Sequence, residues 1–156
     1  MTENRRVIYT AEARVTGGRA EGHGRTSDGA LEVDLRLPQE MGGSGGGTNP
    51  EQLFAIGYAA CFESALGVAA RRRKQEAGDI AIDSKVMLLP TEERAFKLAV
   101  VLAVTLPSVA DLAVAEELVR AAHEVCPYSN ATRGNIDVSL SVNGHDIDAT
   151  SQPTAA

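Results

Sequence analysis

The chain has 156 residues, of which 44% are apolar and none is tryptophan, as expected of one ordinary globular domain. Its 21 acidic residues outnumber the 15 basic ones, which argues against a general nucleic-acid binder. The N-terminus has no apolar signal-peptide core, and the most apolar run of the chain is marked by Gln52 and Glu63, which argues against a membrane span. We therefore predict a single cytoplasmic domain over residues 1–156, with 151–156 as a frayed tail.

Three strands are predicted at the start of the chain. Residues 7–16 alternate between apolar and polar side chains, which is typical of a half-buried strand. The pair Gly17-Gly18 provides a tight turn, and residues 19–25 return as a short strand. Residues 31–37 alternate again. Because the connections are short, the three strands are expected to form an antiparallel meander.

A glycine-rich segment, 42–47, separates this meander from the centre of the chain. A phosphate-binding loop needs a Lys-Ser/Thr pair after its last glycine, whereas Thr48-Asn49-Pro50 follows here. We interpret the segment as a flexible lead-in to a helix, with freedom to move when a ligand enters.

The central element is predicted to be one long helix of roughly 40 Å. Asn49 is suited to cap its first turn, Pro50 to occupy the first helical position, and Gly78 to end it. Apolar and small residues surround the helix almost completely between 53 and 70, so we expect it to be buried. Cys61, in its middle, is then expected inside the fold.

The second half of the chain predicts strands and one further helix. The expected elements are strands at 80–88 and 96–106, a helix from the capping signature of Ser108 and Asp111 to Cys126-Pro127, and a strand at 136–142. Strands and helices do not alternate regularly, so the pattern predicts an α+β fold.

Cys61 and Cys126 are the only cysteines of the chain. Two cysteines are too few for a secreted disulfide scaffold. The residues alone leave two interpretations open, either two unrelated buried thiols or a transient redox pair. In a redox pair, Cys126 suits the thiol that reacts second, because a helix C-terminus disfavours a thiolate.

A reactive Cys61 would need a cation nearby, because burial raises the pKa of a thiol. Arg19 is a candidate for this cation, and Glu51 is able to hold it in a bidentate ion pair. The simpler interpretation is a solvated surface charge and a first-turn helix acid. His123 is a candidate base or metal ligand, or a structural histidine, and the three histidines show no zinc spacing with the cysteines.

Four motifs are more specific than these patterns. They are Gly-Gly-Arg at 17–19, Gly-Thr-Asn-Pro-Glu-Gln-Leu-Phe at 47–54, Ala-Ala-Cys-Phe at 59–62, and Val-Cys-Pro-Tyr-Ser-Asn-Ala-Thr-Arg-Gly-Asn-Ile-Asp-Val at 125–138. With them the chain resembles, over essentially its whole length, the organic hydroperoxide resistance proteins of the Ohr/OsmC superfamily. The Cys-Pro-Tyr-Ser-Asn-Ala run favours that branch over the osmotically inducible one.

The resemblance implies an intertwined α+β homodimer, with antiparallel-rich sheets around long buried central helices. It also implies a bacterial thiol peroxidase, without bound metal or haem, that reduces organic and fatty-acid hydroperoxides to alcohols. Cys61 would be the peroxidatic cysteine and Cys126 the resolving one, through a sulfenic acid and a Cys61–Cys126 disulfide. Arg19 and Glu51 would activate Cys61, and dihydrolipoamide of lipoylated proteins would be the reductant.

Helix geometry further predicts that Arg19 and Glu51 act on Cys61 of the partner subunit. Glu51 and Cys61 are ten residues apart, or about 15 Å along one helix, unless that helix is kinked or starts later. Antiparallel pairing of two such helices about a two-fold axis would bring them together. Two alternatives from other classes remain: a non-catalytic thiol peroxide sensor or binding protein, and a hydrolase that uses Cys61 with His123 as base.

Overall fold

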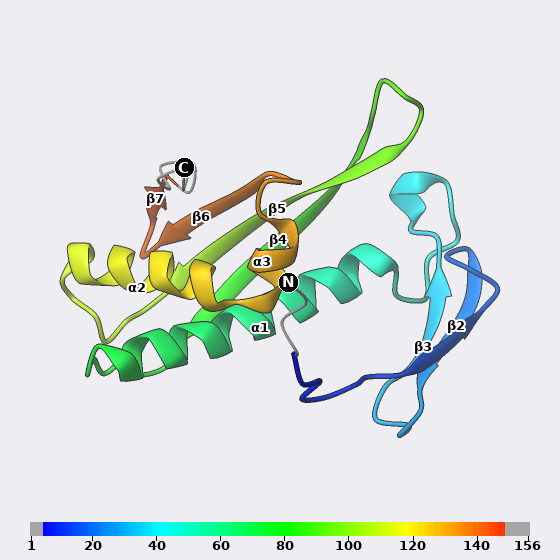
Figure 1. The fold of residues 1–156 in the computed structure, drawn as a ribbon. Helices are drawn as coiled ribbons and strands as arrows, with labels where there is room; N and C mark the ends of the chain where they lie inside the picture. Colours follow the sequence, from blue (N-terminus) through cyan, green and yellow to red (C-terminus); the bar gives the residue numbers. More distant parts are fainter. Residues whose placement is uncertain (1–4, 149–156) are drawn as a thin grey trace. The chain divides into compact units, whose positions relative to one another are not determined.

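The computed structural model describes residues 5–148 (Figure 1). The chain divides into two compact units, Met1–Pro50 and Glu51–Ala156, and each is described by itself. Both contain β-sheet and the second also contains the long helices, which confirms the predicted α+β class. The single domain over 1–156 stays a prediction, and the tail predicted at 151–156 lies outside the described residues.

The first unit is a three-stranded antiparallel sheet in the order β1-β2-β3, which confirms the predicted meander; its strands are Ala13–Thr16, Glu21–Thr26 and Glu32–Arg36. The strand predicted over 7–16 is correct only at its end. Residues 5–12 have no regular structure, and the side chain of Ile8 is 98% exposed. The reason is that Ala13 already pairs with Thr26, the last residue of β2, so within this unit no strand extends far enough to pair with the preceding residues.

The glycine-rich segment 42–47 forms a closed loop after a short 3₁₀ turn, η1 (Gln39–Met41). The N–H groups of Gly43 and Gly45 donate to carbonyl oxygens of residues 38 and 37, both at 3.0 Å, and that of Thr48 donates to Asp34 O at 2.9 Å. A phosphate-binding loop would keep such N–H groups for its ligand. These bonds therefore support the interpretation of the loop as a lead-in to the helix.

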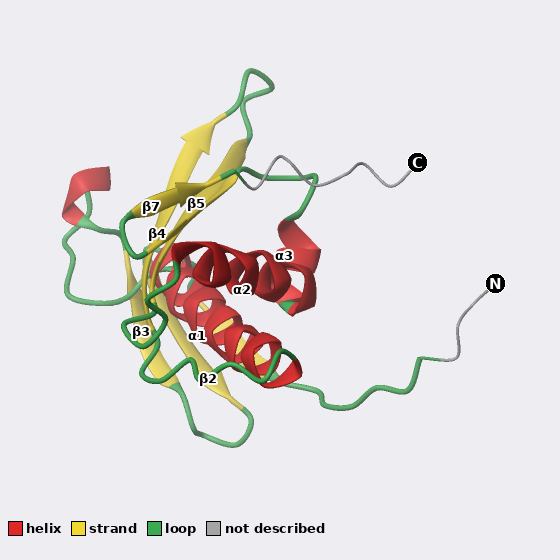
Figure 2. Ribbon diagram, turned by 90° about the vertical axis from the view of Figure 1, so that its left-hand side faces the viewer, coloured by secondary structure: helices red, strands yellow, loops and turns green. Residues whose placement is uncertain are grey.

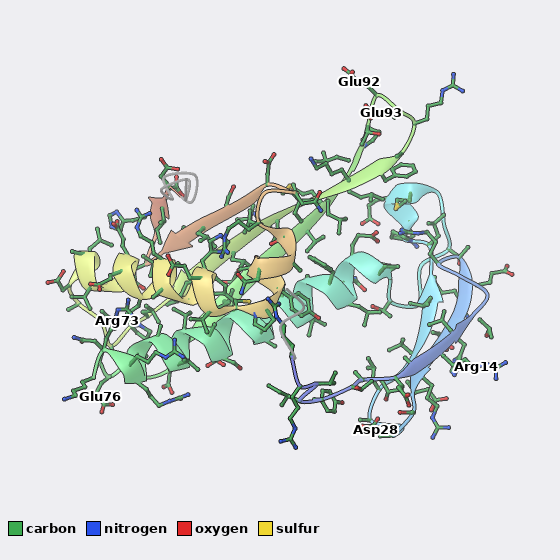
Figure 3. All side chains as sticks on the ribbon, in the orientation of Figure 1. Arg14, Asp28, Arg73, Glu76, Glu92 and Glu93 are labelled. Carbon is green, nitrogen blue, oxygen red and sulfur yellow. The ribbon has the colours of Figure 1, made fainter. Side chains whose placement is uncertain are left out.

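The second unit contains a four-stranded sheet in the order β4-β5-β6-β7, with strands Ala81–Pro90, Phe96–Thr105, Val138–Val142 and His145–Ile147. β4 and β5 form a long antiparallel hairpin, β6 runs parallel to β5, and β7 is antiparallel to β6. Glu92 and Glu93 lie at the tip of the hairpin (Figure 3). The three predicted strands are confirmed, whereas β7 was missed, although Asn143 and Gly144, with φ of 48° and 83°, form the Asn-Gly pair that signals a hairpin.

Helices α1 (Pro50–Arg72) and α2 (Leu112–Val125) cover the same face of this sheet (Figure 2), and a short helix, α3 (Pro127–Thr132), follows α2 directly. The core of the unit lies between these helices and the sheet. Its largest fully buried side chains are Tyr58, Phe62, Leu66, Val100, Leu102, Val104, Leu106, Leu118, Val119 and Val142.

The long helix differs from its prediction in length and burial. It ends at Arg72 rather than at Gly78, because Lys74 takes a left-handed conformation (φ 54°) and the N–H of Gln75 donates back to Ala70 O at 2.9 Å. Its length is therefore about 34 Å. One face is buried in the core, but Ile56 on another face is 70% exposed. A helix that is apolar nearly all round is thus only half covered within one chain.

Two further expectations are corrected. By length and composition α1 is apolar enough to cross a membrane, contrary to the interpretation of Gln52 and Glu63, although the core helix of a water-soluble domain has the same properties. The cap of α2 is Asp111 itself rather than Ser108: its Oδ1 accepts from the N–H of Ala113 at 2.9 Å and of Val114 at 3.3 Å.

Candidate functional site

The two cysteines come together in the second unit. Cys61 lies on α1 and is half-buried, whereas Cys126 lies between α2 and α3 and is fully buried. Both are free thiols, and the Cys126 thiol is close enough to interact with that of Cys61. The fold thus makes neighbours of two residues that are remote in sequence, as the redox-pair interpretation requires. Their roles in a reaction stay a prediction.

The Cys126-Pro127 pair explains why the chain turns at this place. The N–H of Cys126 closes the last turn of α2 onto Ala122 O at 2.8 Å, but its ψ of 123° leaves the helix. A residue before proline is disfavoured in the α conformation, and proline itself is well suited to start the next helix. As a result the N–H of Tyr128, in the first turn of α3, donates to the sulfur of Cys61.

The pKa of the Cys61 thiol is raised within this unit. Burial is the main cause, the neighbouring Cys126 thiol adds to it, and only the N–H of Tyr128 opposes it by stabilising the thiolate. The lowered pKa that the sequence predicts for Cys61 requires a cation close to this thiol, and it stays a prediction.

Arg19 occupies the turn between β1 and β2 and is half-buried. Glycines shape this turn: Gly17 and Gly18 have φ of 76° and 64°, and a Cβ at Gly17 would overlap the carbonyl oxygen of Glu21. Glu51 lies in the first turn of α1, in the other unit. The pairing of Arg19 with Glu51, and of both with Cys61, stays a prediction.

An aromatic cluster, which the sequence analysis missed, lies beside the thiols. The rings of Phe54, Tyr58 and Tyr128 are all mutual neighbours, with centroid separations of 6.0, 5.8 and 5.6 Å. Gly57 leaves room for it, because a Cβ there would approach the Tyr128 hydroxyl to 2.8 Å. The spacing of Phe54 and Tyr58, one helical turn apart, is the signal that was available. The cluster gives Cys61 a partly apolar surrounding.

A buried polar network, which the sequence analysis also missed, joins α1, α2 and α3. The Tyr58 hydroxyl bonds to Ser129 Oγ at 2.8 Å and to Thr132 Oγ1 at 3.1 Å, and Ser129 Oγ bonds to His123 Nδ1 at 2.9 Å. Burial, assisted by the positive charge of Arg133, lowers the pKa of His123 to about 4, so its ring is neutral near pH 7.

The contacts of His123 favour neither the base nor the metal-ligand interpretation. Its Nδ1 bonds to Ser129, and His123 is not among the groups that shift the pKa of Cys61, as a base partner would be. Within residues 5–148 no group of three or more His, Cys, Asp or Glu side chains is arranged to hold a metal ion. The histidine is a buried structural group in this arrangement.

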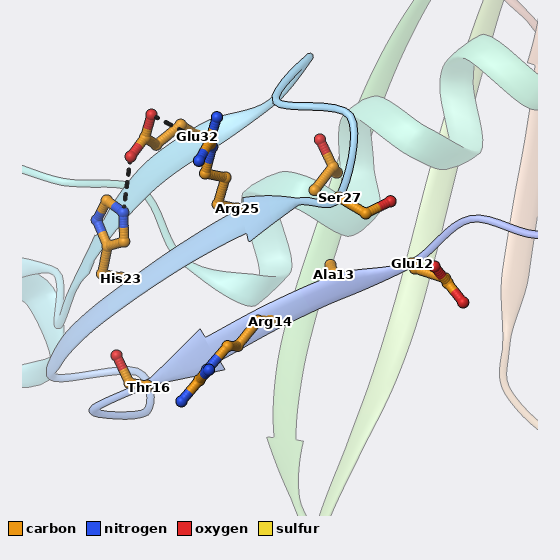
Figure 4. A pocket seen from close by; sticks show the side chains of 9 residues that line it. Glu12, Ala13, Arg14, Thr16, His23, Arg25, Ser27 and Glu32 are labelled. Atoms are coloured by element: carbon orange, nitrogen blue, oxygen red, sulfur yellow. Dashed lines mark hydrogen bonds and ion pairs between the residues drawn. The ribbon is translucent and has the colours of Figure 1, made fainter.

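An open pocket of about 650 Å³ lies in the first unit (Figure 4). Most of the residues that line it are polar or charged, and one of them is His23, whose ring nitrogens bond to Asp34 at 2.9 Å and Glu32 at 3.0 Å. These two carboxylates raise the pKa of His23, with Asp34 as the larger cause. None of the four predicted site residues lines this pocket, so we do not assign the candidate site to it.

Comparison with known proteins supports the resemblance to the organic hydroperoxide resistance proteins. Residues 43–141 match the OsmC-like protein family. The organic hydroperoxide resistance protein of Xanthomonas axonopodis pv. citri is 50% identical, over 91% of this chain and 99% of that protein, and OhrB of Bacillus subtilis is 47% identical, over 86% and 97%.

Solved structures give the same result. An organic hydroperoxide resistance protein from Legionella pneumophila is 52% identical with a TM-score of 0.84, over 88% of this chain and 98% of that one. The structure of Bacillus subtilis OhrB is 46% identical with a TM-score of 0.79, over 87% and 99%. The chain therefore belongs to the OsmC-like family and, within it, to the organic hydroperoxide resistance branch.

Proposed function

We propose that the protein is a cysteine-based peroxidase that reduces organic hydroperoxides to alcohols. The observation that carries the proposal is the neighbouring pair of free thiols, of which Cys61 is half-buried and Cys126 fully buried. One sulfur is thus accessible to a substrate, and the second lies beside it, shielded from solvent. The names of the bacterial relatives, which refer to organic hydroperoxide resistance, agree with this assignment.

The reaction takes three steps in each turnover. The Cys61 thiolate attacks the outer oxygen of ROOH, the O–O bond breaks, and the alkoxide takes a proton and leaves as ROH, so that Cys61 becomes a sulfenic acid. The Cys126 thiol then attacks that sulfur and water leaves, which gives a Cys61–Cys126 disulfide. A dithiol finally reduces the disulfide by thiol–disulfide exchange.

The thiolate needs a cation because burial raises the pKa of Cys61. We assign this role to Arg19, oriented by Glu51 through a bidentate ion pair. α1 runs without interruption from Pro50, so its geometry still separates Glu51 from the Cys61 of its own chain by about 15 Å. We therefore assign Arg19 and Glu51 to the site of the partner subunit in a homodimer.

The dimer also accounts for apolar surface that one chain leaves uncovered. Ile56 on α1 is 70% exposed, and Ile8 and Tyr9 in the N-terminal segment are 98% and 78% exposed. We assign these exposed apolar side chains to the contact with a second copy. A second copy that covers α1 would bury the helix in the way its composition predicts.

The surroundings of Cys61 favour one class of substrate. The cluster of Phe54, Tyr58 and Tyr128 favours a hydroperoxide with an apolar body over hydrogen peroxide. We propose no bound cofactor. The reductant is a dithiol, for which we propose dihydrolipoamide of lipoylated proteins in the cytoplasm.

The test is consumption of tert-butyl hydroperoxide by the pure reduced protein, with dihydrolipoamide or with a monothiol as reductant and hydrogen peroxide as the competing substrate. We expect turnover with the organic substrate and dihydrolipoamide, and none in Cys61→Ser. Binding without consumption would favour the sensor alternative, and hydrolysis of a thioester or ester without peroxide consumption would favour the hydrolase. Either result would refute the peroxidase.

A further inference from the structure

The polar network beside the thiols joins both cysteine-bearing elements. Tyr58 precedes Cys61 by three residues on α1, whereas His123 and Ser129 precede and follow Cys126 by three residues. The Tyr58 hydroxyl reaches from α1 to Ser129 and Thr132 on α3, and Ser129 in turn reaches His123 on α2. A single chain of hydrogen bonds therefore ties all three helices together close to the two sulfurs.

One arrangement of the protons satisfies all four hydrogen bonds of this network. Each hydroxyl has one proton to donate, and the Thr132 hydroxyl donates its own to Ser129 O at 3.3 Å. Tyr58 must then donate to Thr132, and Ser129 must donate to Tyr58. Ser129 Oγ is left to accept from Nδ1–H of His123, which fixes the tautomer of the ring. Every hydroxyl proton has a partner, so replacing one hydroxyl breaks a directional chain rather than a single contact.

Polar contacts help to hold the segment that carries Cys126, between α2 and α3. The Arg133 guanidinium donates to His123 O, and the N–H of Asn130 donates to Cys126 O at 3.0 Å. Tyr58, Ser129 and Cys126 are all fully buried. α3 has only six residues, too few to be stable without such contacts. The network is thus placed to fix where Cys126 lies relative to α1.

We propose that the Tyr58–Ser129–His123 network is a positioning device for the resolving step, which holds the Cys126 thiol against Cys61 so that the disulfide closes quickly. The inference rests on the proposed peroxidase function. The step itself joins the two sulfurs and releases the sulfenic oxygen as water, so the oxidant is the hydroperoxide already consumed. Reaction between two groups is very sensitive to their placement, and an error of about 1 Å is able to slow it on the order of a hundredfold.

The test compares the two steps in Tyr58→Phe and Ser129→Ala, which remove one hydroxyl each. Reduced protein is mixed with one equivalent of tert-butyl hydroperoxide; peroxide loss reports the first step, and mass spectrometry of quenched samples reports the sulfenic acid, trapped with dimedone, and the disulfide. We expect disulfide closure slowed about tenfold or more in both variants. Peroxide loss should stay within about twofold of wild type in Ser129→Ala, because Ser129 lies outside the aromatic cluster. Thr132→Ser, which keeps the hydroxyl, should close at the wild-type rate, as should Ser139→Ala, which removes an exposed hydroxyl on β6.

A peroxide-free measurement separates this inference from the proposed function. Each protein is equilibrated with oxidised and reduced dithiothreitol, and the fraction of Cys61–Cys126 disulfide gives the effective concentration of one thiol at the other. We expect this value to fall about tenfold or more in Tyr58→Phe, even if the wild type were to consume no peroxide. Equal slowing of both reaction steps, or an unchanged effective concentration, would overturn the positioning role.

Discussion

Protonation of His123 should make the protein lose stability in mild acid. The ring is 5% exposed, and its pKa lies at about 4 in the folded chain, against 6.5 in an unfolded one. A group with a lowered folded pKa binds its proton more weakly in the native state, so acid favours unfolding. The stability that depends on neutral His123 is thus fully present above about pH 6.5 and is lost as the pH falls toward 4.

The size of the effect follows from the two pKa values. They differ by about 2.5 pH units, and each unit corresponds to about 1.4 kcal/mol, so the free energy of unfolding should fall by about 3 kcal/mol between pH 7 and pH 4. A fall of that size is a large part of the total stability of an ordinary domain. It should also be steepest between pH 6 and pH 4.5.

The measurement is urea unfolding at fixed protein concentration across this pH range. His123→Asn keeps an N–H near the Nδ1 position but does not titrate, so it should lower stability at pH 7 and flatten the slope toward pH 4. His23→Gln is the matched control, because the raised pKa of His23 gives stability below about pH 6.5 that is lost as the pH rises. That variant should keep the acid slope or steepen it. Equal slopes in wild type and His123→Asn would refute the argument.

Four further outcomes are expected. Cys126→Ser should consume one equivalent of hydroperoxide and accumulate sulfenic acid, whereas Cys61→Ser should do neither; loss of the first turnover in Cys126→Ser would mean that the roles are misassigned. Alkylation of Cys61 against pH should give a midpoint below the free-thiol value of about 8.5 in wild type and above it in Arg19→Ala, and a wild-type midpoint above that value would exclude an activated thiolate. Mixed Arg19→Ala and Cys61→Ser subunits should regain up to about half of the activity, because a heterodimer carries one complete shared site, and no recovery after proven subunit exchange would exclude sharing. Asp111→Ala should lower the free energy of unfolding by about 1 kcal/mol, as judged by urea denaturation, while Ser108→Ala should change it little.

Local patterns predicted the elements whose partners lie nearby in the chain. β3, the β4–β5 hairpin and α2 each show an alternating or helical apolar pattern that matches what they bury. The wrong predictions concern segments whose boundaries depend on more than their own apolar pattern. Residues 7–12 alternate like a strand, but β2 ends before it is able to pair with them. The end of α1 depends on Lys74, a residue type that rarely takes a positive φ, so Gly78 was the stronger signal.

The candidate site was likewise predicted only in part from the sequence. The motif around Cys126 identified the second cysteine, because the Cys-Pro pair has a strong conformational preference and a specific neighbourhood in sequence. Tyr58 and Ser129 carried no such signal. A tyrosine in an apolar helix and a serine in a six-residue helix become a hydrogen-bonded pair only when the fold brings residues 71 positions apart into contact. The direction of the hydrogen bond between them is likewise set only in the folded chain.

The unequal burial of the two sulfurs also decides which of them reacts with thiols and oxidants from solution. Cys126 is 0% exposed, whereas Cys61 is only half-buried. In the disulfide, an incoming thiol would therefore find Cys61 as its electrophile, form the mixed disulfide there, and expel Cys126 as the leaving group. Glutathionylation and irreversible overoxidation should fall on the same sulfur. The buried Cys126 thiol is able to reverse the first of these, because it can displace glutathione as the leaving thiol and form the Cys61–Cys126 disulfide.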